Sequence, residues 1–91
     1  MPQVQLVVEG RVQGVGFRAY VQSTAERLGV DGAVWNTRQG HVEAVASHSD
    51  EDVMNRFIEA VRQGPGYVSW VHVTRAEIDD LGPGFTIGQT I

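Results

Sequence analysis

Apolar residues alternate with polar ones near the start of the chain and then change to a helical spacing. Val4, Leu6 and Val8 occupy every second position, so residues 3–10 predict a strand with one apolar face. Residues 17–28 instead carry apolar side chains three and four positions apart, which predicts a helix with one apolar stripe. The change of period falls on a glycine-containing stretch that joins the two elements.

A hairpin and a second helix are predicted next. Residues 30–36 and 41–47 are rich in apolar and β-branched side chains, and a glycine-containing turn at 37–40 separates them. Ser49 is expected to cap the second helix, with Asp52 completing a capping box. A Gly-Pro-Gly stretch is expected to end this helix.

The last third of the chain predicts one long strand and a weaker one. Residues 67–76 are rich in aromatic and β-branched side chains, residues 79–84 form a loop, and residues 85–91 could add a short edge strand. The order strand-helix-strand-strand-helix-strand is typical of an α+β, ferredoxin-like sandwich, with two helices on one face of an antiparallel sheet. The 91 residues suffice for one domain, residues 1–91.

Composition excludes several classes of function. The chain has no cysteine and no lysine, which removes disulfides, thiol catalysis, cysteine-bound zinc and Schiff-base chemistry. Its net charge of −4 argues against a nucleic-acid partner. No apolar run is long enough to span a membrane and no leader pattern is present, so we expect a cytoplasmic monomer without membrane partners. The three histidines, His41, His48 and His72, are scattered and predict no metal site.

The stretch from Gly10 to Arg18 has the composition of an anion-binding loop, and we call residues 10–18 the cradle. Gly14 and Gly16 allow positive φ and a close approach of a ligand to the main chain. The helix that follows presents unpaired N–H groups and a positive dipole end. Arg18 is a cation at a helix start, which is unfavourable until an anion binds beside it.

Other interpretations of the same residues were weighed. The cradle fits a dinucleotide fingerprint in letters, but the chain is too small and lacks the acidic residue that should follow. It also half-matches an RNA-recognition signature, yet the stacking aromatic is replaced by Val15. The glycines could simply form a turn, Arg18 could pair with a surface acid, and Asn36 could open the hairpin turn.

The cradle, Gly10-Arg11-Val12-Gln13-Gly14-Val15-Gly16-Phe17-Arg18, resembles the signature loop of the acylphosphatase family without a mismatch. The second segment of that family is matched at Gly32, Val34, Asn36, Gly40 and Val42. Ala33 and Trp35 depart from it, His48 stands where glycine is common, and the chain ends without the usual basic-aromatic pair. The resemblance covers nearly the whole chain.

This resemblance implies an enzyme that hydrolyses acyl phosphates to a carboxylate and phosphate, with no metal and no organic cofactor. It implies that Arg18 binds the phosphate and that Asn36 holds the attacking water. The main-chain N–H groups that would surround the phosphoryl oxygens belong to Gln13, Gly14, Val15, Gly16, Phe17 and Arg18. The alternative is a non-catalytic module that binds phosphate or an acyl phosphate through the same loop.

Overall fold

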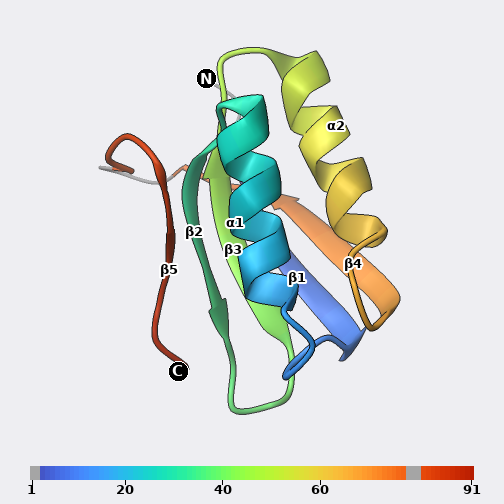
Figure 1. The fold of residues 1–91 in the computed structure, drawn as a ribbon. Coiled ribbons are helices and arrows are strands. Elements are labelled where there is room, and N and C mark those ends of the chain that lie inside the picture. Colours follow the sequence, from blue (N-terminus) through green and yellow to red (C-terminus); the bar gives the residue numbers. More distant parts are fainter. Residues whose placement is uncertain (1–2, 78–80) are drawn as a thin grey trace.

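The computed structural model describes residues 3–77 and 81–91, in which two helices pack on one face of a five-stranded sheet (Figure 1). The predicted α+β order is confirmed, and the predicted 79–84 loop lies partly outside the described residues. In chain order the elements are β1 (Gln3–Arg11), α1 (Phe17–Leu28), β2 (Asp31–Asn36), β3 (Val42–Ser47), α2 (Glu51–Arg62), β4 (Tyr67–Arg75) and β5 (Phe85–Ile87).

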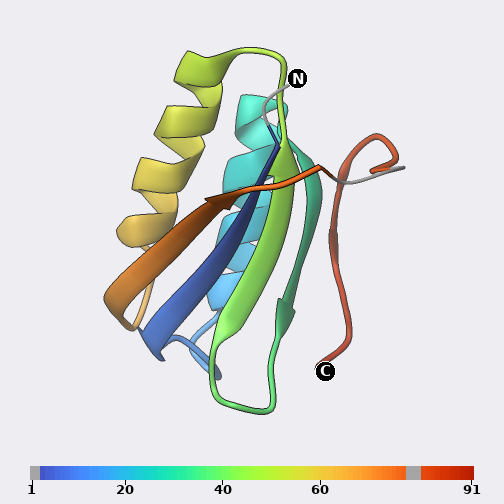
Figure 2. The ribbon, with the colours of Figure 1, turned by 180° about the vertical axis from the view of Figure 1, so that it is seen from behind.

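The strand order across the sheet is β4-β1-β3-β2-β5. Neighbours among the first four strands are antiparallel, as predicted. β5 runs parallel to β2, with Phe85 beside Gly32 and Ile87 beside Val34, so the extra strand makes the sheet mixed. It is shorter than the predicted 85–91 segment. The opposite face of the sheet is turned away from both helices (Figure 2).

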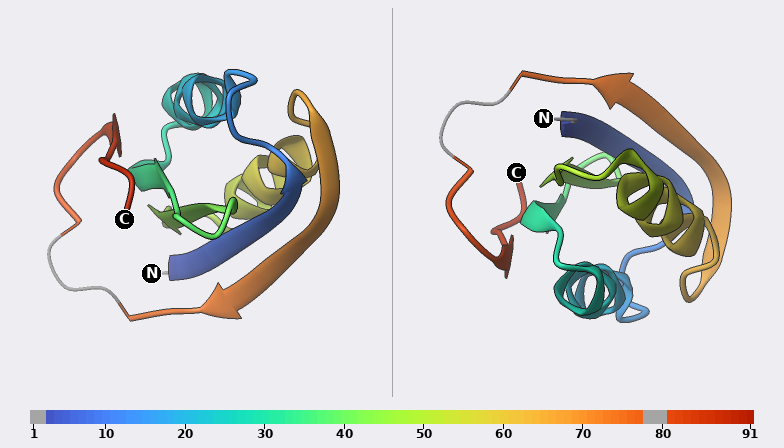
Figure 3. Two further views of the ribbon diagram at one scale, coloured as in Figure 1. Left: turned by 90° about the horizontal axis from the view of Figure 1, so that it is seen from below. Right: turned by 90° about the horizontal axis from the view of Figure 1, so that it is seen from above.

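The core lies between the sheet and the helices, around which the sheet curves (Figure 3). Every second residue of β1 and β3 points inward, as the alternating pattern predicts, and the helices contribute their apolar stripes. Burying each valine, leucine, methionine or phenylalanine side chain of this core is worth about 1.5–3 kcal/mol relative to exposing it. Fourteen described residues of this core are no more than 2% exposed: Leu6, Val8, Val12, Phe17, Val21, Ala25, Val30, Val34, Val42, Ala44, Ala46, Met54, Phe57 and Val61.

The predicted cap of α2 is wrong by one residue. Asp50, not Ser49, is the N-cap, and its side chain accepts a hydrogen bond of 2.8 Å from the main-chain N–H of Asp52. Asp52 therefore acts through its main chain instead of closing a capping box. Aspartate caps as well as serine does. The main-chain N–H of Asp50 also donates to His48 Nδ1 at 2.9 Å, which anchors the chain just before the helix.

Candidate active site

The loop between β1 and α1 turns through two glycines in the left-handed region. Gly14 has φ 73° and Gly16, the N-cap of α1, has φ 79°. A Cβ added to either glycine would meet no atom within 4 Å, so it is the backbone conformation that requires glycine here. No side chain caps α1 and no acidic residue occupies its first turn. The helix start therefore keeps its N–H groups and its positive dipole end for an anion.

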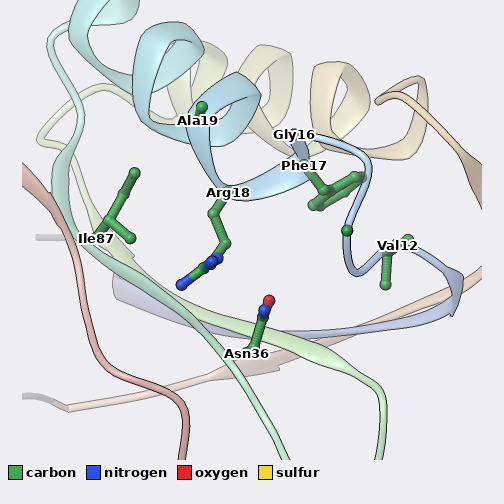
Figure 4. A pocket seen from close by; sticks show the side chains of 8 residues that line it. Val12, Gly16, Phe17, Arg18, Ala19, Asn36 and Ile87 are labelled. Carbon is green, nitrogen blue, oxygen red and sulfur yellow. The ribbon is translucent and has the colours of Figure 1, made fainter.

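A pocket of about 180 Å³ opens beside this helix start (Figure 4). Four of the six predicted phosphate-binding residues line it: Gly14, Gly16, Phe17 and Arg18. Gln13 and Val15 belong to the same loop but are not among the lining residues. Val12, Ala19, Asn36 and Ile87 complete the lining, so β2 and β5 form the wall opposite the cradle.

Arg18 extends its half-buried side chain into the pocket (Figure 4). None of the ion pairs between described residues involves it. The alternative of a surface arginine paired with a neighbouring acid is therefore wrong for the described part of the chain. A guanidinium without a partner beside a helix N-terminus offers a planar fork of donors that matches a phosphate or carboxylate.

Asn36 is the last residue of β2, and its side chain points into the same pocket from the opposite wall (Figure 4). Its Oδ1 atom is buried and has no hydrogen-bond partner in the described part of the chain. Leaving such an acceptor unpaired costs about 1–3 kcal/mol, which a water or ligand in the pocket would recover. Asn36 does not build the hairpin turn. That role falls to Thr37, whose Oγ1 accepts from the main-chain N–H of His41 at 3.2 Å.

A side-chain clamp joins the cradle to this hairpin. Gln13 Nε2 donates to the main-chain oxygens of Thr37 and His41, at 2.7 Å and 2.8 Å. The loop that carries the glycines is thereby fixed to the residue that follows Asn36. Sequence reasoning gave Gln13 only a main-chain role, because nothing local shows that its amide reaches a turn that comes much later in the chain.

The loop after α2 supports the cradle from outside the pocket. A Cβ on Gly66, which has φ 79°, would lie 2.2 Å from the main-chain oxygen of Arg11 and 2.9 Å from Val15 Cγ2. A Cβ on Gly64 would lie 2.5 Å from the ring of Phe17. The sequence marked this stretch only as the end of a helix. The structure shows that its glycines also permit close packing against the cradle.

The remaining candidate residues lie outside the pocket. His41 and His72 both face the carboxylate of Glu9. Trp35 donates from Nε1 to Glu43 Oε1 at 3.2 Å, and Trp70 on the edge strand β4 is 62% exposed. Within residues 3–77 and 81–91, no cluster of His, Cys, Asp or Glu could hold a metal ion. Nor does this part of the chain contain a helix long and apolar enough to cross a membrane.

Fold and pocket together define a small α+β protein with a pocket at the uncapped start of its first helix. The family model Acylphosphatase matches residues 4–87, and the chain belongs to this family. It is 41% identical over 90 residues to an acylphosphatase of Azorhizobium caulinodans, covering 97% of this chain and 96% of that protein.

Solved structures agree with this assignment. The crystal structure of an acylphosphatase from Bacillus subtilis superposes with a TM-score of 0.90 at 37% identity, covering 97% of this chain and 99% of that one. An acylphosphatase from Coxiella burnetii gives a TM-score of 0.88 at 31% identity, covering 96% of this chain and 92% of that one. The fold predicted from the order of strands and helices is confirmed, and so is the family predicted from the cradle motif.

Proposed function

We propose that this chain hydrolyses acyl phosphates to a carboxylate and inorganic phosphate, with the phosphoryl group held by the cradle and the attacking water held by Asn36. Membership of the acylphosphatase family supports the reaction. The observation that supports the assignment of roles is the pocket itself. It brings together, at an uncapped helix start, the guanidinium of Arg18 and the Oδ1 of Asn36, neither of which has a partner among the described residues.

The cradle meets the charge on the phosphoryl group. Main-chain N–H groups of residues 13–18 and the guanidinium of Arg18 surround its oxygens, where fixed donors stabilise the transition state without reorganising. An arginine at a helix start is unfavourable by about 0.3–1 kcal/mol, and a bound anion reverses that sign. Arg18 therefore interacts most favourably when the site is occupied.

Asn36 positions the water. Its Oδ1 accepts a hydrogen bond from the water and holds the water oxygen toward phosphorus, while its amide N–H can donate to a phosphoryl oxygen. The water oxygen bonds to phosphorus as the bond from phosphorus to the acyl oxygen breaks, and the electron pair leaves with the carboxylate. One water proton passes to a phosphoryl oxygen of the substrate. Among the described residues that line the pocket none is His, Asp or Glu, and a carboxylate leaving group requires no strong acid.

We also propose that residues 1–91 form one domain that acts as a monomer in the cytoplasm. The absence of cysteine suits a reducing compartment, in which disulfides contribute nothing. Light scattering of the purified protein at micromolar concentration should give the mass of one chain.

The test of the reaction is hydrolysis of benzoyl phosphate by the purified protein. We expect turnover well above the spontaneous rate without added metal, and loss of that turnover in Arg18→Ala. A rate equal to the spontaneous one would refute the proposal that the chain is an enzyme. If inorganic phosphate nevertheless bound, the chain would be a non-catalytic phosphate-binding module.

A further inference from the structure

The last residues of the chain run along β2 toward the pocket. After β5 pairs with residues 32–34, Gly88 donates its N–H to the main-chain oxygen of Val34 at 2.8 Å. Ile91 then donates to the main-chain oxygen of Asn36 at 3.0 Å, and Arg38 donates to the main-chain oxygen of Ile91 at 2.7 Å. This 88–91 segment therefore continues beyond β5 to the end of β2 (Figure 1).

The hydrogen bond from Ile91 holds the main chain of Asn36 on the side away from β3. Its main chain already pairs with Val42 of β3 on the other side. Without the 88–91 segment, Asn36 would end an edge strand next to a hairpin turn, where strand ends fray most easily. Its side-chain amide has no hydrogen bond through Oδ1 to fix its direction. The direction of that amide consequently depends on how firmly the main chain of residue 36 is held.

We propose that the 88–91 segment is a positioning element for turnover. By holding the main chain of Asn36 between β3 and Ile91, it keeps the side-chain amide aimed at the place of the attacking water. This inference rests on the water-holding role proposed for Asn36. It assigns a function to a stretch that departs from the basic-aromatic ending common in the family.

The segment contributes little to the core. Gln89, Thr90 and Ile91 are exposed, Ile91 to 63%, so the side chains bury little apolar surface. Main-chain hydrogen bonds anchor the segment: it donates two to β2 and accepts one from the main-chain N–H of Arg38 in the hairpin turn. No hydrogen bond between described residues joins it to the cradle. Loss of the segment should therefore lower the rate of turnover while phosphate binding and global stability change little.

The matched pair for this test is Ile91→Pro and Ile91→Ala. Proline removes the N–H that donates to Asn36, whereas alanine keeps that N–H and removes only the exposed side chain. A chain shortened after Gly88 removes both bonds of Ile91. We expect kcat for benzoyl phosphate to fall about tenfold in Ile91→Pro and in the shortened chain, because small misplacements of a reacting group have effects of this order or larger. Ile91→Ala should stay near the parent rate, and the inhibition constant of inorganic phosphate should stay within about twofold in all three.

Two further measurements separate positioning from a loss of structure. In an Asn36→Ala background, shortening the chain should cause no additional fall in kcat, because the segment acts through the missing amide. Amide hydrogen exchange of Arg38 should become faster in the shortened chain, whether or not the protein is active. The exchange measurement keeps this inference testable if the parent protein fails to hydrolyse benzoyl phosphate, which would refute the proposed function.

Three results would overturn the proposal. One is a parent-like kcat in both Ile91→Pro and the shortened chain. Another is an equal loss of kcat on shortening in the parent and in Asn36→Ala. The third is that phosphate affinity and melting temperature both fall together with kcat in the shortened chain. That result would mark the segment as a general structural element.

Discussion

Asn36 and Arg18 face the same pocket from β2 and α1, and no hydrogen bond between described residues joins their side chains. A carboxamide acceptor and a guanidinium that could have satisfied each other are instead left apart with a cavity between the two elements. Each group keeps its hydrogen-bonding capacity for what enters the pocket. Under the proposed mechanism, Arg18 binds the phosphoryl group at one wall and Asn36 holds the water at the other.

Arg18→Ala should abolish measurable turnover and weaken inhibition by inorganic phosphate. Removing one fixed donor from a charge-stabilising site typically costs about a hundredfold to a thousandfold in kcat. Arg18→Lys should recover only part of this loss, since an ammonium cannot form the planar two-point contact. The melting temperature should stay equal or rise slightly, because the cation at the helix start is removed. Parent-like phosphate inhibition in Arg18→Ala would contradict the assignment.

Asn36→Ala should separate turnover from binding. We expect kcat to fall about a hundredfold because the water is no longer positioned, with the phosphate inhibition constant within about threefold of the parent. The unfolding free energy should change by less than about 1 kcal/mol, since the hydrogen bond that is removed is one to a pocket water. Asn36→Asp is the contrasting variant, because its carboxylate keeps an acceptor but repels the phosphate. A large loss of phosphate affinity in Asn36→Ala with kcat retained would remove the residue from the water-holding role.

Gln13→Ala should destabilise the protein by about 2 kcal/mol in urea unfolding, because two hydrogen bonds worth about 1 kcal/mol each are lost, although the main-chain N–H groups of Gly40 and Thr37 still donate to the same two oxygens. The connection between the cradle and the hairpin would be lost as well, so kcat should fall without complete inactivation. Gln39→Ala is the matched control, since Gln39 is exposed on the same hairpin. Equal unfolding free energies for the two variants would show that the Gln13 clamp does not stabilise the fold.

Gly66→Ala should destabilise the fold and weaken phosphate binding together. The new Cβ would lie 2.2 Å from the main-chain oxygen of Arg11, and the residue would be strained at φ 79°. The cradle must then shift away, so we expect more than about 1 kcal/mol of lost stability and a raised phosphate inhibition constant. Gly82→Ala is the control, because its φ is not positive and its added Cβ would meet no atom of the described residues within 4 Å. Similar melting temperatures for both variants would contradict this packing argument.

What could be predicted from the sequence was mostly local. Alternation in β1, helical spacing in α1 and the glycines of the cradle follow from neighbouring residues, and the structure confirms them. The capping-box spacing of Ser49 and Asp52 predicts Ser49 as the cap of α2, whereas the structure has Asp50 there. Serine and aspartate have similar capping propensity, so only the path of the chain decides between these neighbours.

The functional residues beyond the cradle required tertiary structure or a family resemblance. Local chemistry favoured Asn36 as a turn residue, and only the resemblance predicted a place for it in the site. The contacts of Gln13 with the hairpin and of Gly66 with Arg11 join parts of the chain that are distant in sequence. No periodicity or short motif carries such information. The pairing of Ile91 with Asn36 is of the same kind.

The central claim is that a water held by Asn36 attacks the phosphorus atom of a substrate held in the cradle. Hydrolysis of benzoyl phosphate by the protein in ¹⁸O-labelled water tests this most directly, after subtraction of the spontaneous reaction. The mechanism predicts that the label enters inorganic phosphate and that the benzoate contains none. Label in the benzoate would show attack at the carbonyl carbon and would contradict the mechanism.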